Sequence, residues 1–407
     1  MTVVIIGAGQ AGARAAQQLR ASGYRGRVML IGEEPHLPYE RPPLSKAVLQ
    51  GSDSEASVTL QPASFYEAQA IELRLGVRAI RIRREQRQVD LADGSTLDYE
   101  RLILATGLRS RQLLGFELGD RMRALRSLDD AAQLRSCLLP GARLLVIGGG
   151  FLGLEVAATA RRLGCEVTLV ERNVSLLYKA VAPLVGDHIV ALHRRHGVRI
   201  IVGATPRRMS LSADGQRAMV ELSNGEELMA DTVVNATGSI PNTELAETAG
   251  IEVKDGIIAD QFGRTSDPHI YAIGDVSRHF NPVIGRTVRV ESWQNAENQS
   301  AAVARIVCGS TQPYGEVPWF WTDQYDMNLQ IVGYPHAWDE VVQRGGGSPE
   351  RFSVLYLEEG HVVGANLINN GRDTRLMSQW VAQRVRVDAA MAAREDVPLK
   401  AAALDAA

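Results

Sequence analysis

The sequence predicts an α/β protein with two parallel-sheet domains, and three observations support this fold class. Short β-branched runs lead into glycines at two places, TVVIIGAGQAG (residues 2–12) and RLLVIGGGFLG (residues 143–153). A helix-forming stretch and a second hydrophobic run follow each glycine turn. The chain has 407 residues, enough for two to three domains at roughly 150 residues each. Strand, glycine turn, helix and strand in this order are typical of dinucleotide-binding Rossmann folds.

The first glycine turn contains Gly7, Gly9 and Gly12 in G-x-G-x-x-G spacing. Gly7 permits the tight turn, Gly9 lets the backbone approach a pyrophosphate, and Gly12 lets the helix pack close to the strand. The helix N-terminus offers unpaired N–H groups to phosphate. Glu33 lies 33 − 12 = 21 residues beyond Gly12, after the hydrophobic run Arg27–Ile31. A carboxylate at this place accepts hydrogen bonds from ribose hydroxyls.

The second glycine turn repeats the spacing with Gly148, Gly150 and Gly153. Two such turns predict two bound dinucleotides. Glu171 lies 171 − 153 = 18 residues beyond Gly153, and a carboxylate there accepts bonds from a free 2′-hydroxyl and repels a 2′-phosphate. We therefore expect NADH as the nicotinamide cofactor. The adjacent Arg172 leaves NADPH open, unless it is simply a solvated surface arginine.

Three further strand-like runs end in glycine turns, and they are YERLILATG (residues 99–107), DTVVNATG (residues 231–238) and HIYAIGD (residues 269–275). The turns at Thr106 and Gly107 and at Gly238 are expected to carry the chain between the nucleotide domains, close to bound cofactor. Asp275 at the end of the third run is placed to face a flavin ribityl hydroxyl. An aspartate in this position is also a common helix N-cap.

Composition excludes several other classes of protein. Lys plus Arg is 44 and Asp plus Glu is 47, so the formal charge of −3 gives no global field for nucleic acid or anionic lipid. Apolar runs such as Val3–Ile6 and Leu144–Ile147 are far shorter than the roughly 20 residues that span a bilayer. The start of the chain has no basic region typical of a signal peptide. We expect a cytoplasmic protein with no nucleic-acid or membrane partner.

The three cysteines, Cys137, Cys165 and Cys308, are odd in number and widely spaced. They offer neither a disulfide framework nor a zinc site, and they indicate a reducing compartment. We expect no bound metal. Cys137 lies in a helix-like stretch, Cys165 begins a strand and Cys308 ends a helix, so all three are expected to be redox-inactive.

Together these segments resemble the FAD-dependent reductases with two dinucleotide domains, and within them the ferredoxin reductases of bacterial oxygenase systems. The resemblance covers nearly the whole chain, and its most specific parts are LPYERPPLSK (residues 37–46) and PWFWTDQYD (residues 318–326). Both are similar to segments of putidaredoxin reductase and of the reductase components of biphenyl-type and phenylpropionate-type dioxygenases. The resemblance implies a glutathione-reductase-like FAD/NAD fold with a small α+β C-terminal domain.

The implied domains are an FAD-binding domain of residues 1–109 and 237–313, an NAD-binding domain of residues 110–236 and a C-terminal domain of residues 314–407. In the C-terminal domain, strand-like alternation occurs at residues 339–342, 353–357 and 362–366, followed by a helical stretch at residues 374–384. This pattern predicts a small antiparallel sheet with helices. Glycines 345–347 with Ser348 and Pro349 predict a flexible hairpin within it.

The resemblance also implies a set of cofactor contacts. The residues that would contact FAD are Ala11, Glu33, Arg41, Lys46, Ala79, Arg126, Asp275 and Trp293. Arg126 would face the pyrophosphate and Asp275 the ribityl chain. Glu155 would lie near the nicotinamide and pair with Lys46 beside the isoalloxazine, where the lysine stabilises the anionic reduced ring. From the residues alone, Lys46 is equally consistent with a surface lysine after a Pro-Pro turn.

The chain has no cysteine pair where disulfide reductases carry one beside the flavin, and this predicts the acceptor of the electrons. Disulfide reductases need a cysteine pair beside the flavin, and this chain has Arg-Pro-Pro-Leu-Ser at residues 41–45 instead. We therefore expect hydride transfer from NADH to FAD, followed by transfer of single electrons to a [2Fe–2S] ferredoxin. The resemblance implies that this ferredoxin supplies an aromatic-ring dioxygenase or a haem monooxygenase.

The docking surface and two alternative functions stay open. Trp319, Phe320 and Trp321 would border the ferredoxin site, unless they only pack at a domain interface. Candidate basic residues for steering an acidic ferredoxin are Arg289, Arg305, Arg344, Arg372 and Arg375, which are also consistent with scattered solvated arginines. The alternatives are a reductase of another small acceptor, such as rubredoxin or oxygen, and a redox-controlled binding protein like apoptosis-inducing factor.

Overall fold

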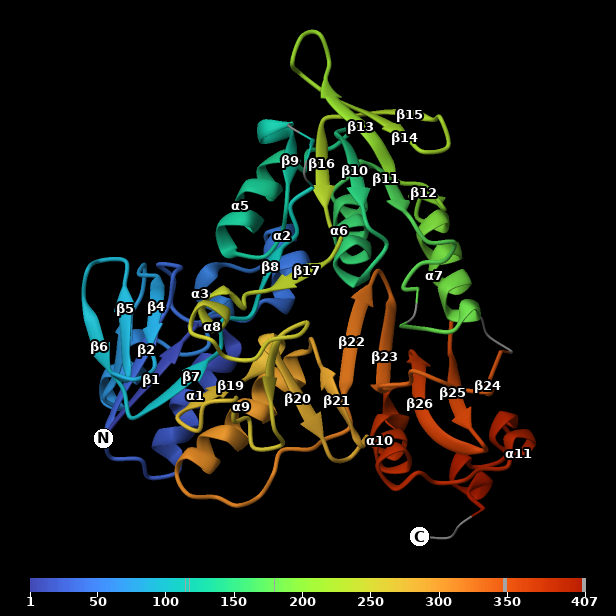
Figure 1. Ribbon diagram of the computed structural model, residues 1–407. Coiled ribbons are helices and arrows are strands. Elements are labelled where there is room, and N and C mark those ends of the chain that lie inside the picture. The colour runs from blue at the N-terminus through green and yellow to red at the C-terminus, as the bar shows by residue number, and fades with distance from the viewer. Residues whose placement is uncertain (114, 117, 179, 347–349, 405–407) are drawn as a thin grey trace. The chain divides into compact units, whose positions relative to one another are not determined.

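The computed structural model describes residues 1–113, 115–116, 118–178, 180–346 and 350–404 (Figure 1). The chain divides into two compact units, unit 1 with Met1–Arg41, Glu55–Arg109 and Ile240–Phe320, and unit 2 with Pro42–Ser54, Ser110–Ser239 and Trp321–Ala407. Unit 2 contains most of the predicted NAD-binding and C-terminal domains. The division into three domains stays a prediction.

Unit 1 is built on a five-stranded parallel sheet in the order β19-β7-β1-β2-β3. Its strands are β1 (Thr2–Ile6), β2 (Arg27–Ile31), β3 (Ile71–Arg74), β7 (Arg101–Leu104) and β19 (Ile270–Ala272). Strands β1, β2 and β7 are mostly continuous hydrophobic runs because apolar clusters cover both faces of the sheet, whereas the edge strand β3 includes Glu72 and Arg74. Helix α1 (Gln10–Ala21) connects β1 to β2 and packs against α9 (Trp293–Val307).

Unit 2 repeats this strand order in a second parallel sheet, β12-β11-β10-β16-β9. Its strands are β10 (Arg143–Ile147), β11 (Glu166–Glu171), β12 (Arg199–Val202), β16 (Thr232–Asn235) and β9 (Met122–Arg123). Helix α6 (Phe151–Arg162) packs on β10 and β11, and α7 (Pro183–Arg195) packs on β12 (Figure 1). In both sheets the chain runs from the central strand, β1 or β10, through the two strands on one side and then crosses to the other side. The units differ in the last edge strand, because β9 precedes β10 in the chain whereas β19 follows β7. The carboxyl end of that central strand is where such sheets bind nucleotides.

Each unit also carries a three-stranded antiparallel sheet that follows its third parallel strand. The strands are β4 (Ala79–Arg83), β5 (Gln88–Leu91) and β6 (Thr96–Asp98) in unit 1, and β13 (Pro206–Leu211), β14 (Ala218–Leu222) and β15 (Glu227–Ala230) in unit 2. The sequence pattern did not predict these strands, so the internal repeat extends further than the two glycine turns.

The shorter elements complete the units. They are β8 (Leu108–Ser110), β17 (Ser239–Pro241), β18 (Ile257–Ala259), β20 (Ser277–Asn281), β21 (Arg286–Arg289), α2 (Ala47–Gln50), α3 (Glu55–Val58), α4 (Ala63–Ala68), α5 (Leu128–Cys137) and α8 (Glu244–Thr248). Turns of 3₁₀ helix lie at Pro42–Ser45, Gly119–Arg121, Gly274–Val276, Gly371–Asp373 and Leu399–Ala402. Among the described helices, none is long and apolar enough to cross a membrane.

The C-terminal region contains the predicted antiparallel sheet with helices. Its strand order is β22-β23-β26-β25-β24, and its helices are α10 and α11. The bounds are β22 (Trp319–Gln324), β23 (Met327–Gly333), β24 (Glu340–Arg344), β25 (Phe352–Glu358), β26 (His361–Ile368), α10 (Thr374–Gln383) and α11 (Ala389–Ala393). Strands β22 and β23 were not predicted. Residues 347–349 of the predicted hairpin lie outside the described residues.

Candidate active site

The first glycine turn is shaped by two close backbone contacts. Gly7 has φ +111°, and a Cβ atom at this residue would lie 2.1 Å from the carbonyl oxygen of Ala105. A Cβ at Gly12 would lie 1.8 Å from the carbonyl oxygen of Gly7. A Cβ at Gly9, by contrast, meets no described atom within 4 Å. Gly7 and Gly12 are therefore required by packing within the protein, whereas Gly9 borders open space.

The second glycine turn has the same geometry in unit 2. Gly148 has φ +113°, and its Cβ would lie 2.3 Å from the carbonyl oxygen of Ala236. A Cβ at Gly153 would lie 2.0 Å from the carbonyl oxygen of Gly148, and a Cβ at Gly150 meets no described atom within 4 Å. In each turn, one glycine, Gly9 or Gly150, thus borders open space at the end of the central strand. This space suits a pyrophosphate group.

The helices behind these turns begin without capping side chains. Among the described residues, no side chain accepts a hydrogen bond as N-cap of α1 or α6, which begin after Gly9 and Gly150, and their first turns hold no acidic residue. In contrast, Ser127 caps α5 and Ser292 caps α9 through their side chains. The first N–H groups of α1 and α6 are therefore left for an anion, and the two dinucleotides fit the sites.

The two candidate ribose carboxylates differ in their surroundings. Glu33 follows β2 in the loop and is exposed. Glu171 is the last residue of β11 and is buried, and its carboxylate accepts hydrogen bonds from the N–H groups of Gly149 and Asn173, each at 2.7 Å. These bonds fix the Glu171 carboxylate against the second glycine turn, while Arg172 is exposed. The contribution of Asn173 was not predicted.

Several predicted FAD contacts gather around the turn that holds Asp275. A Cβ at Gly274 would lie 2.8 Å from the Cβ of Ala11, so this turn lies directly against α1. The N–H group of Gly274 donates to Gln299 Oε1 at 2.8 Å, and the Gln299 amide donates to Ser277 Oγ at 3.1 Å. Gln299 belongs to α9, the helix that begins at Trp293. The buried Gln299 thus positions the Asp275 turn, a role that no sequence motif indicated.

The other predicted residues of unit 1 are spread over three segments. Arg41 forms an ion pair with Glu34 at 2.6 Å. Thr106 Oγ1 donates to the carbonyl oxygen of Asn242 at 2.7 Å, and the Asn242 amide donates back to the Thr106 carbonyl at 2.8 Å. This reciprocal pair fixes the turn that contains Gly107. Ala79 is the first residue of β4.

Two predicted residues of unit 2 lie in loops beside its parallel sheet. Arg126 precedes α5, and its N–H group donates to Asp130 Oδ2 at 2.9 Å. Gly238 follows β16 with φ +107°, in the turn that leads to β17.

Lys46 and Glu155 lie together in unit 2. Lys46 Nζ is 3.0 Å from Glu155 Oε1, and the two side chains are 21% and 9% exposed. Thr322 Oγ1 donates to Glu155 Oε1 at 2.7 Å, and Ser45 Oγ donates to Glu155 Oε2. Thr159, one helical turn after Glu155, donates to the Ser45 carbonyl at 2.7 Å and holds this loop on α6. Lys46 is therefore not a freely solvated lysine.

The three cysteines differ in their exposure. Cys137 is half-buried, Cys165 is buried and Cys308 is exposed, and all three are free thiols. Burial raises the pKa of Cys165 and of Cys308, which disfavours the reactive thiolate. No group of three or more His, Cys, Asp or Glu suited to a metal ion occurs in the described part of the chain.

The five candidate docking arginines fall into two groups. Arg289 pairs with Asp255 at 3.0 Å, and Arg344 donates to the carbonyl oxygen of Val397 at 2.6 Å, so both are engaged within the chain. Arg305, Arg372 and Arg375 are exposed. The aromatic run Trp319 to Trp321 forms the first half of β22 and is half-buried.

Two uncapped glycine turns, each at the carboxyl end of a central parallel strand, define a dinucleotide-binding oxidoreductase. The chain belongs to the pyridine nucleotide-disulphide oxidoreductase family, which matches residues 1–300, and residues 319–403 match the family described as Reductase C-terminal. The fold class, the oxidoreductase activity and the use of FAD and NAD(H), all predicted from the sequence, are confirmed.

Within this family, the chain is similar to reductases that serve ferredoxins. The chain is 43% identical to the anthranilate 1,2-dioxygenase system ferredoxin–NAD(+) reductase component of Burkholderia cepacia, over 98% of each chain. It is 40% identical to putidaredoxin reductase CamA of Pseudomonas putida, over 98% of this chain and 96% of the relative.

Several solved structures match almost the whole chain, and two of them are among the most similar. One is the covalent putidaredoxin reductase–putidaredoxin complex, with a TM-score of 0.95, 39% identity and coverage of 98% of this chain and 97% of the other. Another is the ferredoxin reductase for the CYP199A2 system from Rhodopseudomonas palustris, with a TM-score of 0.94, 40% identity and 99% coverage of both chains. The resemblance to ferredoxin reductases of oxygenase systems is confirmed.

Proposed function

We propose that this protein is an NADH-dependent ferredoxin reductase that passes electrons from FAD to the [2Fe–2S] ferredoxin of a bacterial oxygenase system. The observation that carries the proposal is the combination of two dinucleotide turns with three free cysteines that form no disulfide. Electrons that enter from NADH have no internal disulfide to reduce, so they leave for a separate acceptor. A relative that matches over 98% of its length is named a ferredoxin–NAD(+) reductase component, and one that matches over 96% is named putidaredoxin reductase.

The residues of the chain bind and orient the two nucleotides. The N–H groups behind Gly9 would hold the pyrophosphate of FAD, and those behind Gly150 the pyrophosphate of NADH. FAD, when bound, supplies the conversion of a two-electron hydride donor into a one-electron source. Glu33 and Glu171 would accept the ribose hydroxyls, and Asp275 the ribityl hydroxyls.

Lys46 and Glu155 are proposed as the pair that serves hydride transfer. The Lys46 ammonium provides a fixed positive charge, and fixed charges of this kind stabilise charge that develops in a reaction without reorganising. Glu155 holds Lys46 through a charge-assisted bond of 3.0 Å. Glu155 is five residues after Gly150 and lies in α6, the helix that begins at the proposed NADH turn. Lys46, directly before α2, reaches this helix through the ion pair.

The domain bounds, the localisation and the ferredoxin surface predicted from the sequence belong to the same proposal. The domains would be the FAD-binding domain of residues 1–109 and 237–313, the NAD-binding domain of residues 110–236 and the C-terminal domain of residues 314–407. We place the protein in the cytoplasm, where three unpaired cysteines stay reduced. The aromatic run Trp319 to Trp321 would border the ferredoxin surface.

Anaerobic titration tests the function directly. About one equivalent of NADH should bleach the flavin, and NADPH should do so much more slowly. A purified [2Fe–2S] ferredoxin should then reoxidise the flavin and become reduced in step. Fast bleaching by NADH without reduction of any [2Fe–2S] ferredoxin would overturn the proposal. Reduction of rubredoxin or oxygen at a higher rate would favour a reductase of another acceptor, and a slow reaction with every acceptor would favour a redox-controlled binding protein.

A further inference from the structure

A row of buried polar side chains leads from Glu155 to helix α7 inside unit 2. Gln324 Nε2 lies 3.2 Å from Thr322 Oγ1, and Gln324 Oε1 lies 2.8 Å from His193 Nε2. Thr322, Gln324 and His193 are 0%, 1% and 0% exposed. Burying a polar side chain costs free energy unless it is hydrogen-bonded, and these three are bonded to one another and to Glu155. Their shared end point is the Glu155 carboxylate, so we consider what they do for it.

The directions of these hydrogen bonds follow from the carboxylate at one end. An ionised carboxylate only accepts, so the hydroxyl of Thr322 donates to Glu155 at 2.7 Å. The Thr322 oxygen then accepts from the Gln324 amide, which turns Gln324 Oε1 toward His193. An amide oxygen only accepts, so His193 carries its proton on Nε2. Every donor in the row therefore points toward Glu155.

The protonation of His193 agrees with this direction. Burial lowers the pKa of His193 to about 4, so the ring is neutral near pH 7 and carries one proton. Its Nδ1 atom has no hydrogen-bond partner among the described residues, as expected for the unprotonated nitrogen. The titratable or charged groups described around it are His196, the C-cap of α7, Tyr325, directly after β22, and Arg161 and Arg162 at the end of α6.

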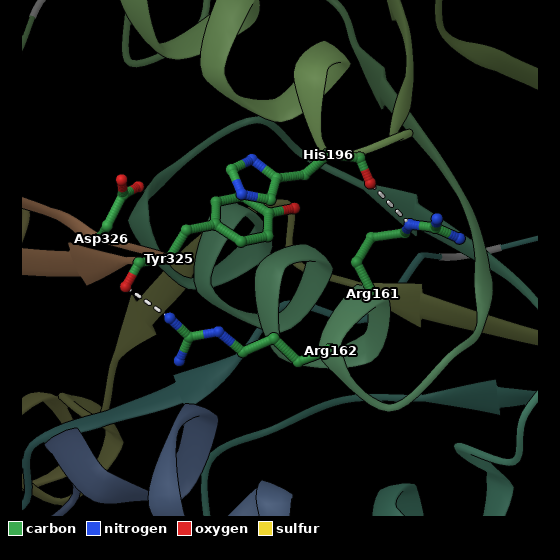
Figure 2. Close-up of a pocket in the computed structure, with 5 residues that line it drawn as sticks. All are labelled: Arg161, Arg162, His196, Tyr325 and Asp326. Atoms are coloured by element: carbon green, nitrogen blue, oxygen red, sulfur yellow. Dashed lines mark hydrogen bonds between the residues drawn. The ribbon is translucent and has the colours of Figure 1, made fainter. Parts of the chain in front are cut away.

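The tip of the β22–β23 hairpin is also anchored by residues outside the row, in addition to the contact between the rings of Tyr325 and His193. Figure 2 shows the His196 ring lying on the Tyr325 ring, with centroids 3.7 Å apart and planes 9° apart. Arg162 donates to the Tyr325 carbonyl, and Arg161 Nε donates to the His196 carbonyl at 2.9 Å. These residues and Asp326 line an open cavity of about 360 Å³. Loss of the Thr322 hydroxyl should therefore leave β22 in place.

We propose that Thr322, Gln324 and His193 are positioning residues that hold the Glu155 carboxylate toward Lys46. The proposal rests on the proposed function, in which this ion pair serves hydride transfer. Thr322 supplies the bond to Glu155, Gln324 orients the Thr322 hydroxyl, and His193 orients the Gln324 amide. The row does not conduct protons, because the Gln324 amide accepts at one end and donates at the other without exchanging its own protons.

The first test compares Thr322→Val, which removes the hydroxyl at nearly constant volume, with Thr322→Ser, which retains it. In anaerobic stopped flow at saturating NADH, Thr322→Val should reduce the flavin about tenfold or more slowly, the size of one charge-assisted hydrogen bond. Its Kd for NADH should stay within about twofold, because the glycine turn is untouched. Thr322→Ser should keep most of the rate. Equal rates for Thr322→Val and the unmodified protein would overturn the proposal.

A second test determines the direction of the hydrogen bonds in the row from the tautomer of His193 in the unmodified holoenzyme. With ¹⁵N-labelled histidine, NMR should show His193 neutral with the proton on Nε2 near pH 7, and the signal is assigned by its loss in His193→Gln. A proton on Nδ1 would reverse the Gln324 amide and overturn the proposal. This readout does not depend on activity, so it remains decisive if a Thr322 variant fails to fold.

The two tests separate the inference from the function on which it rests. If NADH does not reduce the unmodified holoenzyme, the proposed function fails, and the His193 tautomer still reports whether the row ends on Glu155. If the unmodified protein reacts rapidly and Thr322→Val reacts equally rapidly, the function stands and the positioning row fails.

Discussion

Replacement of Gly150 by alanine should separate nucleotide binding from folding. A Cβ at Gly150 meets no described atom within 4 Å, so the folding cost should stay below about 1 kcal/mol. The same methyl group occupies the open cradle in front of α6. A pyrophosphate that loses one or two charge-assisted bonds to backbone N–H groups loses about 1.5 to 3 kcal/mol each, or roughly tenfold to hundredfold in Kd. Gly150→Ala should therefore bind NADH at least about tenfold more weakly and still contain FAD.

Gly153→Ala is the matched control three residues further along the same turn. Its Cβ would lie 2.0 Å from the carbonyl oxygen of Gly148, far inside the distance that real Cβ contacts keep, so the helix start must move. We expect a loss of about 1 to 3 kcal/mol or more of unfolding free energy, seen as a lower urea midpoint. NADH binding to each variant is measured by anaerobic titration of the FAD-containing protein. Normal NADH affinity in a well-folded Gly150→Ala would refute the assignment of this turn to the pyrophosphate.

Three further predictions use other parts of the molecule. Gly9→Ala should fold but retain less than about a tenth of the flavin per protein, because its Cβ also enters an open cradle; full flavin content would contradict the first turn as the FAD site. Glu171→Gln should raise kcat/KM for NADPH about tenfold or more by removing a repulsive charge, and an unchanged preference for NADH would show that Glu171 does not read the ribose. Burial lowers the pKa of His279 from 6.5 to about 4. Between these pH values the histidine is protonated in the unfolded chain and neutral in the native protein. His279 should therefore lower the unfolding free energy by about 3 kcal/mol as the pH falls from 6.5 to 4. In urea unfolding, the stability of His279→Leu should decrease less over this pH range than that of the unmodified protein.

The parts of the fold that follow from local chemistry could be predicted. A glycine at position 7 or 148 is demanded by a carbonyl oxygen within 2.1 or 2.3 Å of its missing Cβ, and such contacts recur wherever this turn forms. The antiparallel strands β13 to β15 escaped prediction because their polar and apolar residues alternate irregularly around exposed turns. Strand β22 was not predicted because its aromatic run was interpreted as a docking surface or as domain-interface packing, and neither interpretation indicates a strand.

The candidate site also contains residues that the sequence predicts and residues that only the fold brings together. Lys46 and Glu155 could be paired through family resemblance, whereas their supporting groups depend on long-range packing. Gln324 and His193 are 131 residues apart and share no motif, so only the fold brings them together. The same holds for Gln299, which is 25 residues from Gly274 along the chain and fixes its turn.

The two halves of the internal repeat share a backbone plan but differ in how their acidic residues are held. Glu171 is buried and fixed by two N–H groups, so the second turn is organised before any ligand binds. Glu33 is exposed, and among its described neighbours Glu34 instead makes the ion pair, with Arg41. A nicotinamide nucleotide that must enter and leave in every turnover benefits from a site that needs no rearrangement, because ordering a side chain on each binding event costs free energy. A flavin that stays bound through many turnovers meets that cost only once. The rigid carboxylate at the second turn and the solvated one at the first are therefore consistent with an exchangeable NADH and a resident FAD.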